Sequence, residues 1–238
     1  MAAGRYDSTS NIIVLRSMID EDAVRALVEK KKQSMFGSPL THPKADTISL
    51  QSLDHFYECL RTVSGRYKAD YLRNATRTLT VDKSVRRVII GGESFELQQT
   101  SRLKKTFSIK RGKSRISIDL KEHVFVDEST KITFDADGNE VPLPKYKTGS
   151  EATEAAYLDI LARNADAIKK PPTEREDAVA LLEERLKSAL EDDIEILAEQ
   201  FDLDSITELY VPMFEARLRG PDNKAVIIRV DAARKKIL

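Results

Sequence analysis

The spacing of apolar residues predicts two helices in the first quarter of the chain. An apolar run at residues 12–15 predicts a short strand ahead of the first helix. That helix is predicted to start at Asp20 or Ser17, either of which can cap it, because its apolar positions recur at helical spacing: Ala23, Val24, Leu27 and Val28. The same spacing predicts a second helix over residues 50–63, stopped by Gly65, with one apolar side formed by Leu50, Leu53, Phe56, Tyr57, Leu60 and Val63.

From residue 66 to residue 143 the pattern changes to short alternating runs, which are typical of strands. These runs cover residues 76–81, 85–90, 106–109, 115–120 and 131–134. Turn residues separate or follow them at Gly91-Gly92, Arg111-Gly112-Lys113 and Asp135-Ala136-Asp137-Gly138. Glycine supplies the positive φ that a chain reversal needs, so this region predicts a series of hairpins.

Helical spacing returns after Pro142 and Pro144. Residues 151–168 predict one helix, which Pro171 and Pro172 stop. Thr173 and Glu176 form a capping box, so the next helix is predicted to begin near Glu174, to continue to Leu190 and to extend at most into residues 194–197. Two strands, at residues 209–218 and 225–230, predict a hairpin around the turn Gly220-Pro221-Asp222-Asn223.

These elements predict an α+β fold in which helices pack on antiparallel sheets. A length of 238 residues allows one large domain or two small ones, and we expect two. Residues 1–146 would form an N-terminal α+β domain whose second half is strand-rich and basic. Residues 147–238 would form a domain of acidic helices plus a β-hairpin.

Two predicted helix starts resemble each other. Glu21-Asp22-Ala23-Val24, followed by Leu27-Val28-Glu29, is similar to Glu176-Asp177-Ala178-Val179, followed by Leu181-Leu182-Glu183. Asp and Glu favour the first turn of any helix, so chance similarity is the alternative to duplication. Duplication would give two related helix-plus-hairpin units around a central strand-rich region.

The C-terminal quarter resembles the PepSY-like family of small α/β modules. The resemblance covers a helix, residues 210–218, residues 226–231 and the segment Val230-Asp231-Ala232, which matches the Val-Asp-Ala that commonly ends the family's last strand. The family then has a glycine, whereas this chain continues with Ala233-Arg234-Lys235-Lys236. The resemblance implies a non-catalytic regulatory or interaction module and carries over no active-site residue.

Charge is segregated along the chain although the net charge is zero. Residues 61–115 contain 15 Lys and Arg against 4 Asp and Glu, whereas residues 150–209 contain 6 against 17, so the two segments carry +11 and −11. A basic segment attracts phosphates or acidic surfaces, and an acidic segment of the same chain can neutralise it or bind something else. The sequence leaves open which of these holds.

The basic side chains that we consider a candidate binding site lie within a stretch free of acidic residues: Arg102, Lys104, Lys105, Lys110, Arg111, Lys113 and Arg115. On a hairpin, alternation would turn the interleaved Phe107 and Ile109 toward a core and the cations toward solvent. Such a ribbon can contact a nucleic-acid backbone without reading bases. The alternative is a solvated face whose charges discourage edge-to-edge aggregation.

Other candidate chemistry has simpler explanations. Asp135, Asp137 and Asn139 alternate as calcium ligands do, but an EF-hand would need Gly where Glu140 stands, so a hairpin turn is the better interpretation. Neither the three histidines nor the single cysteine has metal-ligand spacing, and a Cys59–His55 nucleophile pair would need an oxyanion site for which there is no signal. Phosphate-loop, dinucleotide, zincin and nucleophile-elbow motifs are absent, so we expect no cofactor and no metal.

We therefore expect a non-enzymatic interaction or regulatory module with a protein partner or self-association. The alternatives are a sequence-independent nucleic-acid-binding protein that uses the basic hairpin, and a hydrolase whose carboxylates converge from distant positions. A single cysteine, a polar N-terminus and the lack of an apolar run long enough to span a bilayer lead us to expect a cytoplasmic protein without membrane association.

Overall fold

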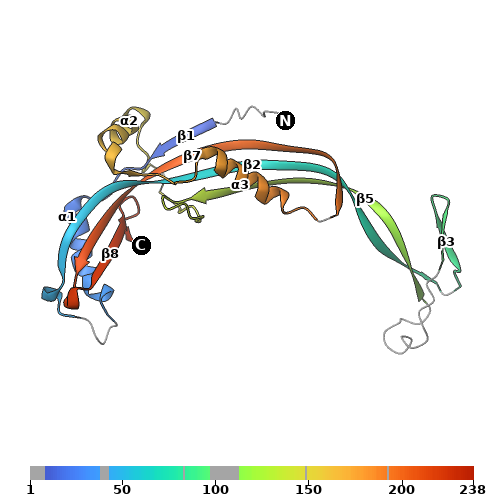
Figure 1. The fold of residues 1–238 in the computed structure, drawn as a ribbon, viewed down its shortest axis with the longest axis horizontal. Helices are drawn as coiled ribbons and strands as arrows, with labels where there is room; N and C mark the ends of the chain where they lie inside the picture. Colours follow the sequence, from blue (N-terminus) through green and yellow to red (C-terminus); the bar gives the residue numbers. More distant parts are fainter. Residues whose placement is uncertain (1–8, 38–42, 83, 97–112, 148, 192) are drawn as a thin grey trace. The chain divides into compact units, whose positions relative to one another are not determined.

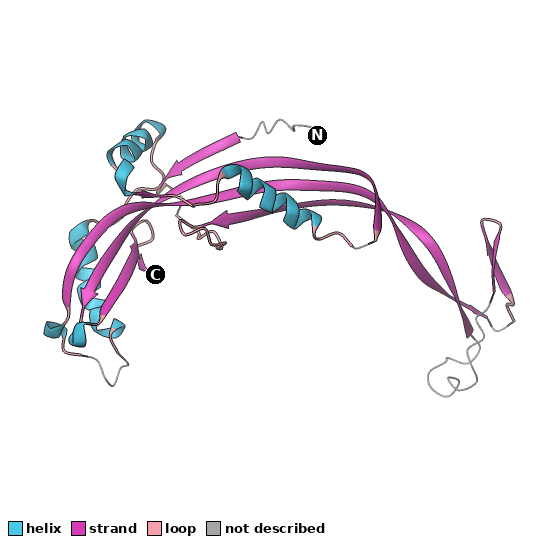
Figure 2. Cartoon of the chain, in the orientation of Figure 1, coloured by secondary structure: helices cyan, strands magenta, loops and turns pink. Residues whose placement is uncertain are grey.

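The computed structural model describes residues 9–37, 43–82, 84–96, 113–147, 149–191 and 193–238. Its helices are α1 (Glu21–Lys31), α2 (Glu154–Arg163) and α3 (Arg175–Lys187). Its strands are β1 (Thr9–Val14), β2 (Ser49–Asp82), β3 (Arg87–Ile90), β4 (Glu93–Glu96), β5 (Lys113–Phe134), β6 (Ile168–Lys169), β7 (Ile194–Arg219), β8 (Ala225–Asp231) and β9 (Lys236–Ile237). Figures 1 and 2 show these elements along the chain. The α+β class, with mostly antiparallel sheet, is confirmed.

The chain divides into two compact units. Unit 1 comprises residues 1–66, 129–186 and 202–238, and unit 2 comprises residues 67–128 and 187–201. The helices belong to unit 1 apart from the last residue of α3, and the three long strands β2, β5 and β7 each contribute to both units. The boundary expected between residues 146 and 147 stays a prediction.

In unit 1 the main sheet has the order β5-β2-β7-β8-β9. Side chains join β2 to β7 from Arg61 to Glu208 and from Ser64 to Ser205. Residue numbers therefore rise on β2 as they fall on β7, which is the antiparallel order. The predicted C-terminal hairpin is confirmed, because β7 pairs antiparallel with β8 from Met213 opposite Asp231 onward.

Unit 1 contains two strand–helix–strand segments, β1-α1-β2 and β6-α3-β7, and the first strand of each pairs with the last strand of the other. β1 precedes α1 but pairs parallel with β7, which follows α3. Conversely, β6 precedes α3 but pairs parallel with β2, which follows α1. The helices with the similar starts, Glu21-Asp22-Ala23-Val24 and Glu176-Asp177-Ala178-Val179, thus follow strands that pair reciprocally, and a duplication stays a prediction.

The core of unit 1 is aliphatic and aromatic and includes α1. Asp20 caps this helix as expected, because its carboxylate accepts a hydrogen bond from the Ala23 amide at 2.8 Å. The buried face of α1 packs on the β7–β8 hairpin in a cluster that comprises Val24, Val28, Phe36, Ile48, Phe214, Ala216, Leu218, Ile228, Val230 and Ala232. Figure 1 shows α1 beside β8 accordingly.

Unit 2 is built differently, since it has no helix of its own within its described residues. Its strands are the outer parts of β2 and β5, the start of β7, and the β3–β4 hairpin, which forms a separate two-stranded sheet around Gly91 and Gly92. Both glycines have positive φ, 58° and 92°, as the predicted turn requires. Few apolar side chains are buried there: Tyr67, Ala69, Tyr71, Ile116 and Ile118.

Two predicted helical segments are wrong. Residues 50–63 belong to β2 and residues 194–197 to β7. Most side chains between Phe56 and Val63 are buried, so neither face of the strand shows the polar alternation that identifies a half-exposed strand. Length and β-branched content decide such ambiguous runs, and spacing alone does not. The predicted series of short hairpins is likewise replaced in part by long strands, β2 having 34 residues.

Candidate interaction surface

The predicted basic site falls largely outside the described residues. Arg102, Lys104, Lys105, Lys110 and Arg111 lie there, and so does the predicted strand at residues 106–109. Lys113 begins β5, and the Arg115 side chain two residues later is exposed. The idea that all seven cations share one face therefore stays a prediction.

Part of the opposing charge is neutralised inside the chain. In unit 2, Arg73 forms ion pairs with Glu122 and with Glu191 of the acidic segment. Arg77 shares Glu122, whose pKa is lowered by hydrogen bonds from Arg77 and Arg73. Lys121 reaches Glu195 at 3.1 Å. Glu191 of the α3–β7 connection and Glu195 of β7 belong to the acidic segment, whereas Glu122 lies on β5.

Three arginines of unit 2 carry exposed side chains that form no hydrogen bond or ion pair with the described residues. They are Arg86 and Arg87 at the start of the β3–β4 hairpin, and Arg115 near the start of β5. Arg86 and Arg87 were not among the predicted site residues, although two adjacent arginines within the strand predicted at residues 85–90 were a visible signal. These guanidinium groups are available to an external anion.

Unit 2 also exposes a disproportionate share of apolar side chains. Half of the exposed large apolar residues of the described chain lie in this unit, which holds about a third of the residues: Leu79, Ile89, Ile90, Leu120, Phe125, Ile196 and Leu197. Ile89 is 65% exposed and Ile90 48% exposed on the β3–β4 hairpin. A two-stranded sheet is marginal in water by itself, and a sheet normally buries its apolar face against a second layer.

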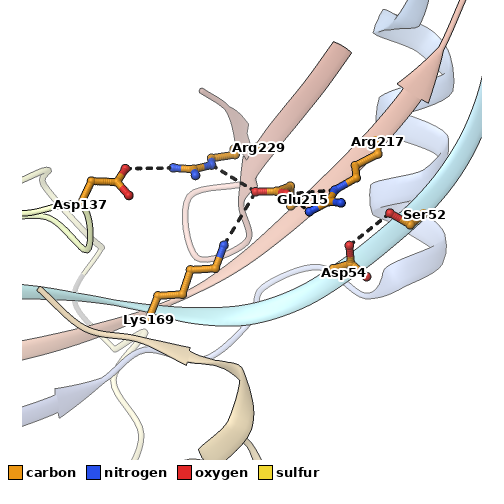
Figure 3. A network of polar contacts seen from close by, with 7 residues as sticks. All are labelled: Ser52, Asp54, Asp137, Lys169, Glu215, Arg217 and Arg229. Carbon is orange, nitrogen blue, oxygen red and sulfur yellow. Dashed lines mark hydrogen bonds and ion pairs between the residues drawn. The ribbon is translucent and has the colours of Figure 1, made fainter. Parts of the chain in front are cut away.

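Unit 1 contains a charged network around Glu215 of β7 (Figure 3). The buried Glu215 carboxylate lies 3.2 Å from Arg217 Nη2, 3.4 Å from Arg229 Nε and 3.8 Å from Lys169 Nζ. Arg229 also reaches Asp137 at 3.9 Å, and Lys169 lies over the Phe56 ring, 3.7 Å from its centre. Because its three cationic partners come from β6, β7 and β8, this carboxylate connects the three strands.

A second buried carboxylate, Glu208, lies where β2, β7 and α3 meet. It is 2% exposed and accepts hydrogen bonds from Arg61 at 3.1 Å, Arg175 at 3.2 Å and the Tyr210 hydroxyl at 3.0 Å. Arg61 is itself buried and also donates to the Thr173 carbonyl, which precedes α3. Desolvation raises the pKa of Glu208, but the bonds from Tyr210, Arg175 and Arg61 outweigh it and the net pKa is lowered.

Cys59 and His55 do not form a nucleophile pair. Both lie on β2, four residues apart. Their side chains therefore point to the same face of the strand but are separated by four residue rises along it, which is too far for direct contact. Cys59 is fully buried, and burial raises the pKa of its thiol to about 12. His55 packs against Phe214 and Tyr57, and burial lowers its pKa. A thiol held in its protonated form is a poor nucleophile.

Two acidic residues stabilise turns: Asp135, which suggested a calcium site, and Asp231, which belongs to the family motif. Asp135 accepts hydrogen bonds from the amides of Asp137 and Asn139 at 3.0 and 2.8 Å, so the hairpin-turn interpretation accounts for this loop. Asp231 of the Val-Asp-Ala segment is 1% exposed and accepts from the amide and the guanidinium of Arg234 at 2.8 and 2.6 Å. Its carboxylate therefore shapes the β8–β9 turn.

In the described part of the chain, a hollow of about 400 Å³ on unit 2 is lined by residues 74–76 and 119–121, where the Asp119 carboxylate accepts a hydrogen bond from Thr76. Among all described residues, no three His, Cys, Asp or Glu side chains are grouped so that they could hold a metal ion. Among the helices described, none combines the length and apolar character that crossing a membrane requires.

Comparison with protein-family models, with curated proteins and with solved structures finds no match to this chain. Its function must therefore be argued from its own residues.

Proposed function

We propose that the chain is a non-enzymatic interaction or regulatory protein that binds a protein partner through unit 2. The observation that carries this proposal is the apolar surface of that unit, above all Ile89 and Ile90 on a two-stranded hairpin. Apolar side chains in this number on a unit with so few buried residues are costly in water, at about 25 cal/mol for each Å². A partner surface that covers them removes this cost.

The test is capture of a partner by the full-length chain, crosslinked in the cells that make it. Ile89→Asp with Ile90→Asp should abolish capture, because two charges would be buried in the interface. Leu158→Asp is the matched control, since Leu158 is 60% exposed on α2 in unit 1, and this variant should capture the partner like the wild type. Recovery of all three proteins as free chains, or turnover in an activity screen, would overturn the proposal.

Nucleic acid is the second candidate, favoured by Arg86, Arg87 and Arg115. Each cation that contacts a phosphate of duplex DNA releases counterions, so the logarithm of the affinity falls by about 0.9 for each tenfold rise in salt per contact. Replacing the three arginines with Ala should flatten this slope by about 2.7 if all of them touch phosphates. The control removes three exposed lysines of unit 1, Lys30, Lys31 and Lys145.

The titration uses labelled single- and double-stranded DNA and RNA without a defined sequence. We expect weak binding that is equal among sequences, because backbone contacts carry no sequence information. An unchanged salt slope in the arginine variant, or no binding at low salt, would eliminate this candidate.

A further inference from the structure

The outer edge of β5 in unit 2 is open. β5 is the terminal strand of the main sheet and pairs with β2 on its inner side. The contacts Thr76–Asp119 and Arg73–Glu122 fit one antiparallel register, because residue numbers rise on β5 by as much as they fall on β2. No described strand pairs with residues 121–128 on the other side. Every second residue of such an edge directs its amide and carbonyl groups outward, where they can template another strand.

The side chains along this edge are apolar at its centre. Val124, Phe125 and Val126 form an uninterrupted run, and Phe125 is 60% exposed. Natural edge strands are often protected by Lys or Pro, and neither residue occurs at positions 123–127 of β5. An aromatic residue flanked by valines is instead favourable for strand pairing.

The sequence of this edge complements itself when two copies run antiparallel about a two-fold axis at Phe125. In this register Phe125 meets its own copy, and Val124 meets Val126 of the second copy. His123, which lies 3.1 Å from Asp70 within its own chain, comes opposite Asp127 of the second copy. Antiparallel pairing of identical strands produces a closed two-fold interface that leaves no further open β5 edge.

One like-charge pair opposes this register. Glu122 comes opposite Glu128 of the second copy, but the Glu122 carboxylate is already in contact with Arg73 and Arg77. Because amide and carbonyl directions alternate along the strand, the competing registers are shifted by two residues, and they place Phe125 opposite His123 or opposite Asp127 of the second copy. Only the register centred on Phe125 pairs all three residues of the apolar run with apolar residues.

We propose that two copies of this chain associate by antiparallel pairing of their β5 edges at residues 122–128, with Phe125 at the two-fold axis. This inference rests on the proposed role of unit 2 as an interaction surface and names one partner for it. Strand pairing over so short a segment lies at the small end of specific interfaces, so the dissociation constant should be on the order of micromolar.

The first test is sedimentation of the full-length chain from about 1 to about 100 μM. The wild type should convert from monomer to dimer over this range. Phe125→Lys places two like charges at the two-fold axis and should raise the dissociation constant at least about tenfold, whereas Leu158→Lys, at equal exposure on α2, should leave it unchanged. A wild type that stays monomeric, or a dimer that persists in Phe125→Lys, would overturn the pairing.

Oxidative crosslinking tests the register and does not depend on a strong dimer. Cys59 is buried, so Phe125→Cys introduces an accessible thiol that should crosslink to its own copy, about tenfold more than Leu158→Cys. His123→Cys should crosslink to Asp127→Cys in a mixture more than either crosslinks to itself. Equal crosslinking of Phe125→Cys and Leu158→Cys would refute the two-fold axis.

The two proposals can fail separately. If the chain is monomeric and Phe125→Cys does not crosslink, while the Ile89 and Ile90 variant still loses a captured protein, self-pairing is wrong and the interaction function stands. If the β5 dimer forms and no other protein is captured, self-association is the whole of the interaction that unit 2 provides.

Discussion

Replacing Glu208 with Gln removes the negative charge that two buried or half-buried arginines share. Arg61, whose side chain is 6% exposed, would keep its positive charge with only neutral acceptors, the Thr173 carbonyl and the new amide oxygen at position 208. Its Nε atom is already buried without a hydrogen-bond partner, so no further acceptor compensates the lost negative charge. Arg175 is 41% exposed and can turn toward water.

The expected loss of unfolding free energy depends mainly on Arg61, because its charge stays buried. Removing one partner of a buried ion pair typically costs about 3 to 5 kcal/mol, because the remaining charge stays desolvated. A domain is stable by only about 5 to 15 kcal/mol, so the variant loses a large part of the stability of unit 1. For a chain of this size the midpoint of thermal unfolding should fall by roughly 6 to 20 °C.

The assay is urea unfolding followed by far-ultraviolet circular dichroism, with the free energy of unfolding extrapolated to water. Glu199→Gln is the control, since Glu199 also lies on β7 and accepts from Tyr67 at 2.6 Å and Lys187 at 3.3 Å, but it is exposed and should cost at most about 1 kcal/mol. Arg61→Met combined with Glu208→Leu should recover stability relative to Glu208→Gln. Equal stabilities of Glu208→Gln and the control would refute the reasoning.

The same carboxylate predicts a pH dependence. The pKa of Glu208 in the folded chain lies below its ordinary value of 4.5, so the folded state binds its proton less readily than the unfolded state does. The stability that this charge contributes is complete above pH 4.5 and is lost as the pH falls through the lower folded value. The stability difference between the wild type and Glu208→Gln should therefore shrink only below pH 4.5.

Three further predictions concern single positions in unit 1. Lys235 holds a left-handed φ of 59°, so Lys235→Gly should stabilise the chain by up to about 1 kcal/mol, whereas Lys235→Ala should not; equal unfolding midpoints for both would contradict this. Gly220→Ala should cost about 1 to 3 kcal/mol in urea unfolding, because the added Cβ would overlap the Phe36 ring, and an unchanged midpoint would mean that the ring moves freely. The Cys59 thiol, buried and with its pKa raised to about 12, should react with a maleimide at pH 8 at least about 100-fold more slowly in the folded chain than in urea, and equal rates would show that the site is open.

The candidate surface was only partly predictable. The basic character of residues 61–115 was visible in the sequence, yet Arg73 and Arg77 meet acidic side chains while Arg86, Arg87 and Arg115 do not. Ion pairing depends on which strands become neighbours, and charge counts along a sequence do not contain that information. The exposed edge of β5 was hidden for the same reason, because Val124 to Val126 would be unremarkable in a central strand.

The sequence by itself determined the features that local chemistry controls. Asp20 caps α1, Gly91 and Gly92 turn the β3–β4 hairpin, and the turn after Arg219 joins β7 to β8, because each depends on backbone angles and hydrogen bonds within a few residues. The α+β class followed from the sum of such signals.

Only the tertiary structure decided that residues 50–63 form a strand and not a helix. It also decided that β1 pairs with β7 and β6 with β2, and that Glu208 and Glu215 are buried. An apolar run satisfies a helix or a strand equally well until its neighbours supply hydrogen-bond partners on one side or both. A buried carboxylate is tolerated only where cations from distant segments converge on it. Several of these outcomes depend on contacts between residues far apart in the sequence, such as Arg61 with Glu208, which no local pattern records.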